Sequence, residues 1–263
     1  MTNVTDSKTE GALWGAQAKD WADIQEPTSE PLWNVMLDAT GVTAGTRFLD
    51  VGCGAGGAEL LAAKRGAVIS GVDAAPNSIA LAKSRILEAS FQVGDMQALP
   101  FEAETFDAVI SVNCIQFVPD AKKGVSELAR VCKAGSKVSI AVFGEPAKVD
   151  EDVIFNALAD LLPPPKPTFK EYRFSCPGQV EDLMRNAGLG DLVTETINTP
   201  FIYPNPEIGY RGQRSAGSLQ EVIEAVGEKA VKDAIFRSFE RFAKPDGKIY
   251  MNNEMIYVTG TRT

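Results

Sequence analysis

The amino-acid sequence predicts an α/β fold in which a parallel sheet carries helices on both faces. Between residues 46 and 144, short β-branched apolar runs alternate with segments of helical periodicity, which is typical of βαβ units. The first run leads into a glycine-rich turn, "VGCGAGG", as in nucleotide-binding domains. The composition, 44% hydrophobic and 23% charged, is that of an ordinary globular domain.

Five apolar runs are predicted to form the buried strands: "RFLDV", "AVISGVD", "SFQVGD", "FDAVISV" and "KVSIAVF". The intervening segments, "GAELLAAKRG", "PNSIALAKSRILE" and "DAKKGVSELARVCKAG", have apolar residues at helical spacing. Gly66 and Gly135 stand where a helix commonly ends in a left-handed residue. Right-handed crossovers between parallel strands would then place helices on both faces of the sheet.

Helical patterns also flank this core. Upstream, residues 1–45 include the segment "EPLWNVMLDATG". Downstream, helical patterns at 150–162, 176–189 and 206–242 surround a strand-like stretch, "LVTETINTPFIY", and the last segment, "KIYMNNEMIYVTGT", has a strand pattern. We find no internal repeat, and therefore expect a single domain over 1–263 whose insertions cap the sheet.

The balance of charge excludes several classes of partner. The net charge is −9, so a basic surface for nucleic acid or anionic lipid is not expected. There is no apolar run of roughly eighteen residues, and the segment "MTNVTDSKTEG" lacks the pattern of a signal or transit peptide. We expect a cytoplasmic protein without a nucleic-acid or membrane partner; its oligomeric state stays open.

The chain contains no histidine. It therefore lacks the commonest general base and the commonest metal ligand, which excludes Ser-His and Cys-His triads and histidine-ligated zinc hydrolases. Its cysteines, Cys53, Cys114, Cys132 and Cys176, are far apart and form no C-x-x-C pair, as expected of reduced thiols. We expect no metal site.

The glycine-rich turn is informative about the charge of a ligand. Gly52, Gly54 and Gly57 fit the spacing G-x-G-x-x-G, but Asp50 precedes them by two residues. A carboxylate beside a pyrophosphate would be repelled. Asp50 instead favours a cationic ligand such as S-adenosylmethionine, which carries an ammonium group and a sulfonium. On this evidence alone, a tight turn without any ligand stays open.

Two further acidic residues follow the next two strands. Asp73 ends the second strand, 21 residues after Gly52 (73 − 52), as expected of a carboxylate that binds ribose hydroxyls; it could also cap the next helix. Asp95 follows the third strand, where it can accept from the adenine amino group while Met96 packs on the ring. Strand ends share one edge of a parallel sheet, so these acidic residues are expected in one crevice.

These segments resemble the motifs of class I S-adenosylmethionine-dependent methyltransferases, of the ubiquinone/menaquinone-biosynthesis-like small-molecule type. "LDVGCGAG" resembles the first motif, "GVDAAPNSIALAKSR" the second, "VGDMQALPFEAETFDAVISVNCIQFVPD" the third and fourth, and "LARVCKAGSKVSIAVFG" the fifth-strand region. The resemblance covers about residues 48–144. It implies a Rossmann-like methyltransferase fold, doubly wound, with seven strands of which the last is antiparallel. It also implies S-adenosylmethionine as cofactor and S-adenosylhomocysteine as product.

The resemblance implies site residues as well. Cofactor contacts are expected at Asp50, Gly52, Cys53, Gly54, Asp73, Ala74, Asp95, Met96 and Asn113. "WGAQAKDWA" is similar to the family's N-terminal segment, with Trp14 and Trp21 in its aromatic positions. Such rings close over the sulfonium, although these tryptophans could also be core residues. Many relatives have a histidine near the position of Phe117, whereas this chain contains no histidine.

The resemblance divides the single domain into four parts. Residues 1–45 are expected to form a helical lid and 46–144 the cofactor-binding core. Residues 145–247 would form cap insertions with a sixth strand, and 248–263 the last strand.

Methyl transfer from a sulfonium is an in-line displacement, which an enzyme accelerates by alignment and by exclusion of water. Asn113 and Gln116 are candidates to orient the acceptor, or else they tie the strand end to a loop. Aromatic residues and a cation in and around the cap suit a small, partly apolar or anionic metabolite: Phe143, Phe155, Phe169, Tyr172, Phe174, Phe201, Tyr203, Tyr210 and Arg211. The acceptor atom, whether O, N, C or S, stays open.

Two other functions stay open. One is a non-catalytic cofactor- or partner-binding protein on the same fold. The other is an NAD-dependent oxidoreductase, for which the chain lacks the usual Tyr-x₃-Lys or histidine group. Because there is no histidine, we expect activity to follow ionisation of the acceptor. One inflection near neutral pH shared by all acceptors would instead indicate a protein base, first of all a buried carboxylate of the cap or Cys114.

Overall fold

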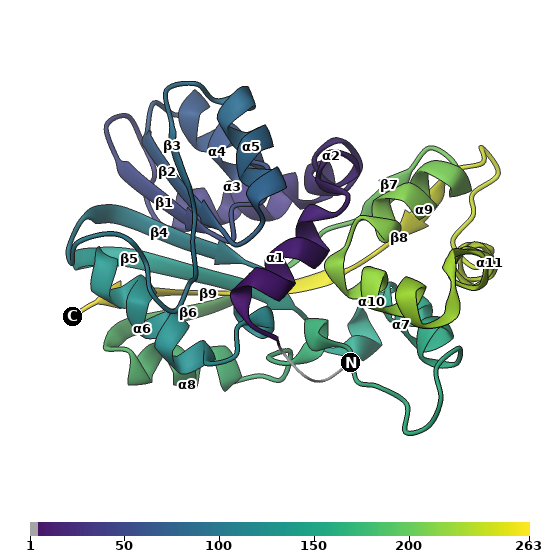
Figure 1. Cartoon of the computed structure of the whole chain (residues 1–263). Coiled ribbons are helices and arrows are strands. Elements are labelled where there is room, and N and C mark those ends of the chain that lie inside the picture. Colours follow the sequence, from purple (N-terminus) through teal and green to yellow (C-terminus); the bar gives the residue numbers. More distant parts are fainter. Residues whose placement is uncertain (1–4) are drawn as a thin grey trace.

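The computed structural model describes residues 5–263, and its centre is a seven-stranded sheet in the order β3-β2-β1-β4-β5-β9-β6 (Figure 1). The parallel neighbours are β3 (Ser90–Val93), β2 (Val68–Asp73), β1 (Arg47–Val51), β4 (Phe106–Val112) and β5 (Cys132–Phe143). β9 (Glu254–Arg262) runs antiparallel between β5 and β6 (Leu189–Asn198). The predicted doubly wound sheet with an antiparallel last strand is confirmed.

The order of the strands reverses between β1 and β4. The chain builds β1, β2 and β3 toward one edge and then returns to place β4 on the other side of β1. The loops after β1 and β4 therefore leave the sheet in opposite directions, which opens a crevice at the carboxyl ends of these strands.

Helices cover both faces of the sheet (Figure 1). One face carries α3 (Glu30–Ala39), α4 (Gly57–Lys64) and α5 (Pro76–Arg85), and the other carries α6 (Ala121–Val131) and α8 (Gln179–Asn186). Alternate residues of β1 enter the two layers, Phe48 the first and Leu49 the second, and both are fully buried. The strands are continuous apolar runs because both of their faces are covered.

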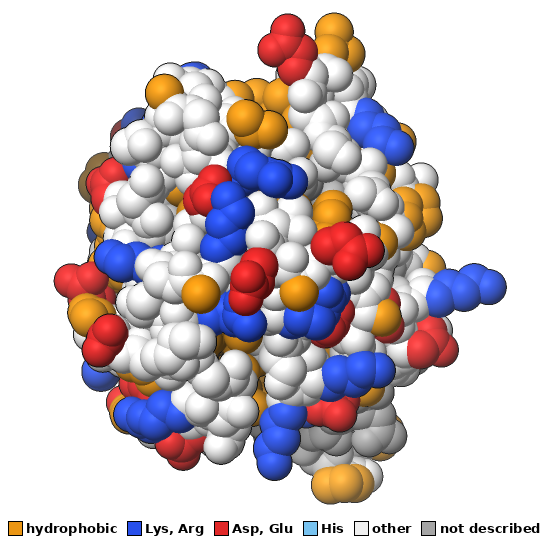
Figure 2. Space-filling view, turned by 90° about the vertical axis from the view of Figure 1, so that its left-hand side faces the viewer, with side chains coloured by type: hydrophobic (Ala, Val, Ile, Leu, Met, Phe, Trp, Pro, Cys, Tyr) orange, Lys and Arg blue, Asp and Glu red, His pale blue; other side chains and the backbone are white. Residues whose placement is uncertain are grey.

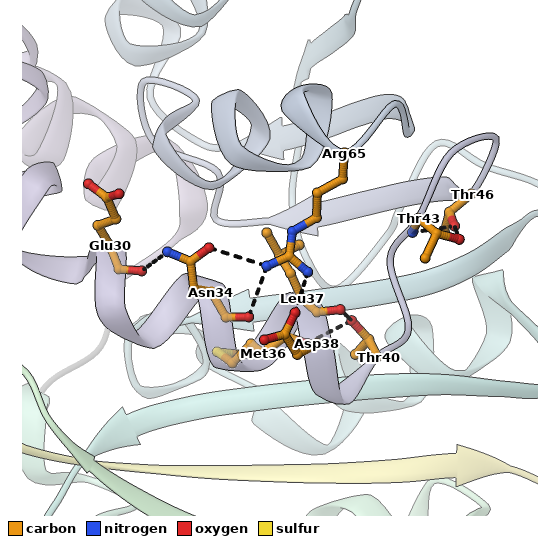
Figure 3. Close-up of polar contacts among 9 residues, drawn as sticks. All are labelled: Glu30, Asn34, Met36, Leu37, Asp38, Thr40, Thr43, Thr46 and Arg65. Carbon is orange, nitrogen blue, oxygen red and sulfur yellow. Dashed lines mark hydrogen bonds and ion pairs between the residues drawn. The ribbon is translucent and has the colours of Figure 1, made fainter.

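An arginine joins α3 and α4, as Figure 3 shows. Arg65, directly after α4, donates to Asp38 Oδ1 at 2.6 Å and to the backbone oxygen and Oδ1 of Asn34 at 3.3 and 3.2 Å. Both acceptor residues lie on α3. At the end of α3 the Thr40 hydroxyl donates to the Met36 carbonyl at 2.7 Å, which satisfies a carbonyl of the last turn.

The cap lies beyond the carboxyl ends of the parallel strands, on the right of Figure 1. It comprises α7 (Asp152–Ala159), β7 (Phe201–Tyr203), α9 (Pro206–Arg214), α10 (Gly217–Val226), α11 (Glu228–Phe239) and β8 (Ile249–Met251). Between cap and core lie four short helices, called the N-terminal helices below: α1 (Ser7–Gly15), α2 (Ala18–Asp20), η1 (Trp21–Gln25) and η2 (Glu26–Ser29). α1 packs on both α5 of the core and α10 of the cap.

The last segment, predicted as one strand over 248–263, is divided in two. β8 pairs with β7 in a small antiparallel sheet, and only β9 joins the main sheet. The break falls at Asn252 and Asn253, because both bind the start of the cap instead of a ladder partner. The Asn252 N–H donates to Asp150 Oδ2 at 2.7 Å, and Asn253 Oδ1 accepts from the Glu151 N–H at 3.0 Å.

The two glycines predicted to end helices behave differently. Gly66, with φ of +80°, follows α4 as predicted. Gly135 also has a positive φ, +75°, but lies inside β5. α6 ends earlier because Cys132 already pairs with Phe106 of β4.

The amino ends of the parallel strands form a surface on which acidic and basic side chains alternate, as Figure 2 shows. Ion pairs at this edge include Lys133 with Asp107 at 2.5 Å and Arg262 with Glu104 at 2.9 Å. Over residues 5–263, none of the helices has the length and apolar character needed to cross a membrane.

Replacing Arg65 with Met should lower the free energy of unfolding by about 1–2 kcal/mol, because a charged donor to a second helix is lost. Arg185→Met is the matched control, since Arg185 pairs with Asp182 of its own helix and both side chains are exposed. We expect its loss to stay below about 0.5 kcal/mol. Urea unfolding measures both, and equal losses would contradict the role of Arg65.

Candidate active site

A first cavity lies at the carboxyl ends of the central strands, under α1. The structure brings nine of the predicted cofactor residues into its wall: Trp14, Trp21, Gly52, Gly54, Asp73, Ala74, Asp95, Met96 and Asn113. Sequence reasoning missed other residues of this wall: Ser7, Glu10, Gly11, Ser78, Phe117, Val118 and Pro119. Pro119 lies within the quoted fourth-motif segment, whereas nothing in the sequence marked Ser7 or Glu10.

The glycine turn after β1 needs its glycines for close approach. Gly52, with φ of +86°, donates its N–H to the Val72 carbonyl at 2.7 Å. A Cβ on Gly52 would lie 2.7 Å from Cys114 Cβ, and one on Gly57 would lie 2.3 Å from the Trp33 ring. Any other residue at these two positions would push the end of β4 and helix α3, which carries Trp33, away from the turn.

Asp73 ties the glycine turn to the end of β2. Its Oδ2 accepts from the Gly54 N–H at 2.9 Å and its Oδ1 from the Ala75 N–H at 2.7 Å. Burial raises the pKa of Asp73, and the two N–H donors oppose that rise. A carboxylate has about four acceptor positions, so both oxygens can still accept from a ligand in the cavity.

The walls after β3 and β4 are held in place by local contacts. Asp95 Oδ1 accepts from the Gln97 N–H at 2.8 Å. Asn113 adopts a left-handed φ of +48°, which asparagine tolerates better than most residues. Its Oδ1 accepts from Gln116 Nε2 at 3.2 Å. The two candidate acceptor-orienting residues are therefore hydrogen-bonded to each other.

Asp50 lies on the other face of β1 from the first cavity. It is 3% exposed, and its Oδ1 has no hydrogen-bond partner among the described residues. Burial raises its pKa well above the usual range, and the charges of Asp73 and Glu26 raise it further. Alternation along the strand explains this, because Asp50 shares the face of Phe48, which α4 covers. Asp50 and Cys53 line the neighbouring second cavity instead.

Trp14 and Trp21 cover the first cavity from the side of the N-terminus. Their rings meet edge to face, with centroids 5.1 Å apart, and Trp14 also meets Phe117 at 5.0 Å. Two glycines allow this close packing: a Cβ on Gly11 of α1 would lie 2.1 Å from the Ala74 carbonyl oxygen, and one on Gly217 of α10 would lie 2.7 Å from the Trp14 ring.

Two buried carboxylates anchor these N-terminal helices. Glu26 Oε1 accepts from the Ala55 N–H of the glycine turn at 2.7 Å, and its Oε2 pairs with Arg85 of α5 at 2.6 Å. Glu10 of α1 pairs at 2.7 Å with Lys170 of η5 (Lys170–Tyr172), and the two side chains are 7% and 2% exposed. Lys170 also lies 3.4 Å from Glu221 of α10. These contacts join the glycine turn, the N-terminal helices and the cap.

A second cavity adjoins the first and extends toward the cap. The residues that line both are Trp14, Trp21, Gly52, Gly54, Val112, Asn113 and Phe117. The remaining wall is aromatic and acidic, and includes Gln25, Glu26, Trp33, Gln116, Phe143, Glu151, Phe155, Glu171 and Phe201. Within residues 5–263, neither cavity is lined by a lysine or an arginine.

The cap residues that the sequence suggested for an acceptor pocket separate into two groups. Phe143, Phe155 and Phe201 line the second cavity. The others do not line it. Phe169, Tyr172, Tyr203 and Tyr210 pack in the neighbouring core, and Phe174 packs in the apolar layer between the sheet and helices α6 and α8. Arg211 forms an ion pair with Asp20 at 2.6 Å, outside both cavities.

The cysteines next to the site are held as thiols. Burial raises the pKa of Cys114, and the carboxylates of Asp73 and Asp50 raise it further. Burial also raises the pKa of Cys53, with Glu59 as the next cause. A thiolate nucleophile is therefore disfavoured at both positions. The described part of the chain contains no group of three or more cysteine or acidic residues placed to hold a metal ion.

Residues 49–140 match the family model described as a methyltransferase domain. An uncharacterised protein of Mycobacterium bovis is 36% identical over 124 residues, 46% of this chain and 45% of that protein. Norajmaline N-methyltransferase of Rauvolfia serpentina is 33% identical over 130 residues, 44% of each chain. Demethylmenaquinone methyltransferase of Tropheryma whipplei is 33% identical over 113 residues, 41% of this chain and 46% of that protein. The chain thus spans less than half the length of each of these relatives.

Solved structures share the fold over most of the chain. YcgJ from Bacillus subtilis has a TM-score of 0.60 at 21% identity, covering 88% of this chain and 97% of that one. Phosphoethanolamine N-methyltransferase 2 of Haemonchus contortus, in complex with phosphomonomethylethanolamine and S-adenosylhomocysteine, has a TM-score of 0.57 at 22% identity. The match covers 88% of this chain and 52% of that one. The [4+2]-cyclase SpnF has a TM-score of 0.57 at 17% identity, and the match covers 89% of this chain and 82% of that one.

Together the family match and these structures confirm the resemblance of the core to class I methyltransferases, and its Rossmann-like methyltransferase fold. At such low sequence identities these structures show a similarity of fold alone. The cyclase shows that one fold serves different reactions.

Glu59 of α4 offers a test of the buried charge beneath the turn. It is fully buried, and neither of its oxygens has a hydrogen-bond partner among the described residues. Burial raises its pKa well above the usual value of about 4.3, and Asp50 adds to the rise. The folded state therefore keeps this proton to higher pH than the unfolded chain does. Its contribution to the free energy of unfolding falls as pH rises from about 4.3 toward the folded pKa.

Glu59→Gln retains the shape and removes the titration. Between about pH 5 and pH 8 its free energy of unfolding should fall less than that of the original protein. Denaturant unfolding at several pH values measures the slopes. Glu240→Gln, at an exposed position of the cap, should keep the original slope. If both variants behaved alike, Glu59 would not be the titrating group.

Proposed function

We propose that this chain, whose residues 49–140 match a methyltransferase domain, binds S-adenosylmethionine and transfers its methyl group to a small, partly apolar acceptor. The sign of the charge around the first cavity carries this proposal. Asp73 and Asp95 line the cavity, and within residues 5–263 no lysine or arginine does; Glu10 lines it too, but its charge is balanced by Lys170. An acidic cavity favours a ligand with ammonium and sulfonium groups and disfavours the pyrophosphate of NAD.

The residues present fit such a cofactor. Asp73 is placed to accept from the ribose hydroxyls and Asp95 from the adenine amino group, with Met96 against the adenine ring. Trp14 and Trp21 line the same cavity, and their aromatic rings would favour a sulfonium beside them. Asp50 and Cys53 lie in the wall of the second cavity. They would therefore contact the cofactor from beneath the glycine turn.

The second cavity fits an acceptor beside the cofactor. When bound, S-adenosylmethionine supplies a methyl group activated by positive sulfur. The chain's part is to align the acceptor with that methyl group and to exclude water. Asn113 and Gln116 are placed to orient the acceptor, since Asn113 lines both cavities and the buried Gln116 Oε1 has no partner among the described residues. The N-terminal helices would exclude water, because Trp14 and Trp21 close both cavities on one side.

A protein that only binds the cofactor would need no second cavity of this kind. The adjoining aromatic cavity therefore favours an enzyme over a binding protein. The direct test is to incubate the protein with S-adenosylmethionine and a metabolite extract, and to look by mass spectrometry for products heavier by one methyl group. A protein that binds S-adenosylhomocysteine but forms no such product would support the binding function instead.

Asp73→Ala should weaken S-adenosylhomocysteine binding by about 1.5–3 kcal/mol, the scale of hydrogen bonds that involve a charged group. This corresponds to an increase in Kd of roughly 10- to 150-fold. All three tryptophans of the chain line the cavities, so quenching of tryptophan fluorescence can measure the binding.

Asp160→Ala is the control for this measurement, because Asp160 lies on the surface of the cap and pairs with Lys166. Its Kd should equal that of the original protein, and unfolding curves show whether each variant remains folded. An unchanged Kd in folded Asp73→Ala would refute the role proposed for Asp73.

A further inference from the structure

We propose that the acceptor is an amine that enters the second cavity as an ammonium ion, and that Glu151 takes its proton before methyl transfer. This inference rests on the proposed function and adds a substrate class and a residue that accepts the proton. It depends on two carboxylates of the cap, on the aromatic wall around them and on a lining that, over residues 5–263, includes no lysine or arginine.

Glu151 and Glu171 present free acceptor atoms to the second cavity. The two residues are 5% and 3% exposed, and Oε2 of each lacks a hydrogen-bond partner in the part of the chain described. Both line the cavity, Glu151 from the start of α7 and Glu171 from η5. A buried charged oxygen without a partner is costly, and a ligand with N–H donors and a positive charge relieves that cost.

Neighbouring contacts hold the two carboxylates in place. Asn253 Oδ1 accepts from the Glu151 N–H at 3.0 Å, which fixes the start of α7. Ser218 of α10 donates its hydroxyl to Glu171 Oε1. Asn253 therefore fixes the backbone that carries Glu151, Ser218 holds the carboxylate of Glu171, and Oε2 of each residue stays available.

The groups around Glu151 are acidic or neutral. Burial raises its pKa to about 8, the charge of Glu171 contributes, and the amide of Gln213 opposes the rise. The tyrosines Tyr172 and Tyr203 also lie close enough for the Glu151 charge to raise their pKa. Asp152 follows Glu151 on α7 and raises the pKa of Tyr172 as well.

The lysine of η5, Lys170, which precedes Glu171 in the chain, is already paired. Lys170 contacts both Glu10 and Glu221, so its charge is more than balanced. An entering ammonium ion would thus be the first cation to face Glu151. Its charge would favour the ionised carboxylate and bring the proton-accepting form of Glu151 into the neutral pH range.

The aromatic wall selects the same class of acceptor. Trp14, Trp21 and Trp33 line the cavity, and tryptophan faces attract cations most strongly among aromatic side chains. A carboxylate or phosphate acceptor would meet Glu151 and Glu171 without a balancing lysine or arginine in the lining described, whereas the third carboxylate, Glu26, is already paired with Arg85. The cation expected from the sequence, Arg211, is bound to Asp20 at the surface. The cavity therefore disfavours the anionic acceptor that the sequence left open.

The proton transfer balances as follows. The ammonium group gives one proton to Glu151 and becomes a neutral amine with a free electron pair. That pair forms the new N–C bond to the methyl carbon while the C–S bond breaks and its electrons remain on sulfur. The methylated amine carries the positive charge that the sulfonium carried before. Glu151 returns its proton to water when the product leaves. In a chain without histidine, a carboxylate with a raised pKa can act as this base.

The test uses matched acceptors with the complete protein. Benzylamine, 2-phenylethylamine and 4-phenylbutylamine are compared with the alcohols and carboxylates of equal length, each titrated into the protein saturated with S-adenosylhomocysteine. At least one amine should bind ten-fold or more tightly than its alcohol and carboxylate counterparts, and should gain a methyl group with S-adenosylmethionine. Stronger binding of alcohols or carboxylates, or no binding of any amine, would overturn the inference.

Variants then separate the base from a structural effect. Glu151→Gln should lower kcat for the amine by about 10²- to 10⁴-fold, as expected for a lost general base. Glu171→Gln should mainly raise KM, because it removes charge but not the base. In Glu151→Gln the pH profile should follow the ionisation of the amine alone. Glu240→Gln, on the exposed cap surface, should match the original enzyme.

The affinity for S-adenosylhomocysteine distinguishes the two proposals. A protein that does not bind it fails the proposed function itself. If binding is normal and Glu151→Gln keeps its kcat and its pH profile, the role of Glu151 is refuted while methyl transfer stands.

Discussion

The absence of side chains at three positions of one turn is the constraint on which the rest of the site depends. Gly52 leaves room for Cys114 at the end of β4, Gly54 for Trp21 and Glu26, and Gly57 for Trp33. These contacts let the N-terminal helices rest on the turn, where Glu26 binds the Ala55 N–H. Without that approach neither cavity would be closed. The glycines therefore do more than bring backbone close to a ligand, since they also admit the protein segments that enclose it.

Negative charge is the second organising feature. Carboxylates reach the two cavities from the N-terminal helices, the strand ends and the cap, and within the described chain no lysine or arginine lines either one. Desolvation raises the pKa of three residues of these linings, Asp50, Asp73 and Glu151. Such an arrangement is unfavourable on its own and is relieved by cationic ligands. The same physical argument thus supports both the sulfonium cofactor and the amine acceptor proposed here.

The cap forms much of the wall of the second cavity, and it lies outside the matched part of the chain. The family match covers 49–140, whereas Glu151, Phe155, Glu171 and Phe201 of the second cavity all follow it. The names of relatives, such as norajmaline N-methyltransferase, therefore give the substrates of those proteins alone. For this chain, a proposal about the acceptor has to be based on the residues of its own cap. Conserved folds with variable loops commonly divide the work in this way.

The sequence by itself determined the parts of the protein whose neighbours in space are also neighbours in the chain. Alternation of strands and helices predicted the sheet, and acidic residues at successive strand ends placed Asp73 and Asp95 in one crevice. Tertiary structure alone decided that Asp50 turns toward α4, because this depends on which face of β1 the helix covers. It alone brought Glu151 and Glu171 into the wall of one cavity with Trp14, which precedes them by 137 and 157 residues (151 − 14 and 171 − 14). It also removed Arg211 from the site by pairing it with Asp20. Contacts between such distant segments are set by how the cap folds back over the sheet, and no local periodicity carries that information.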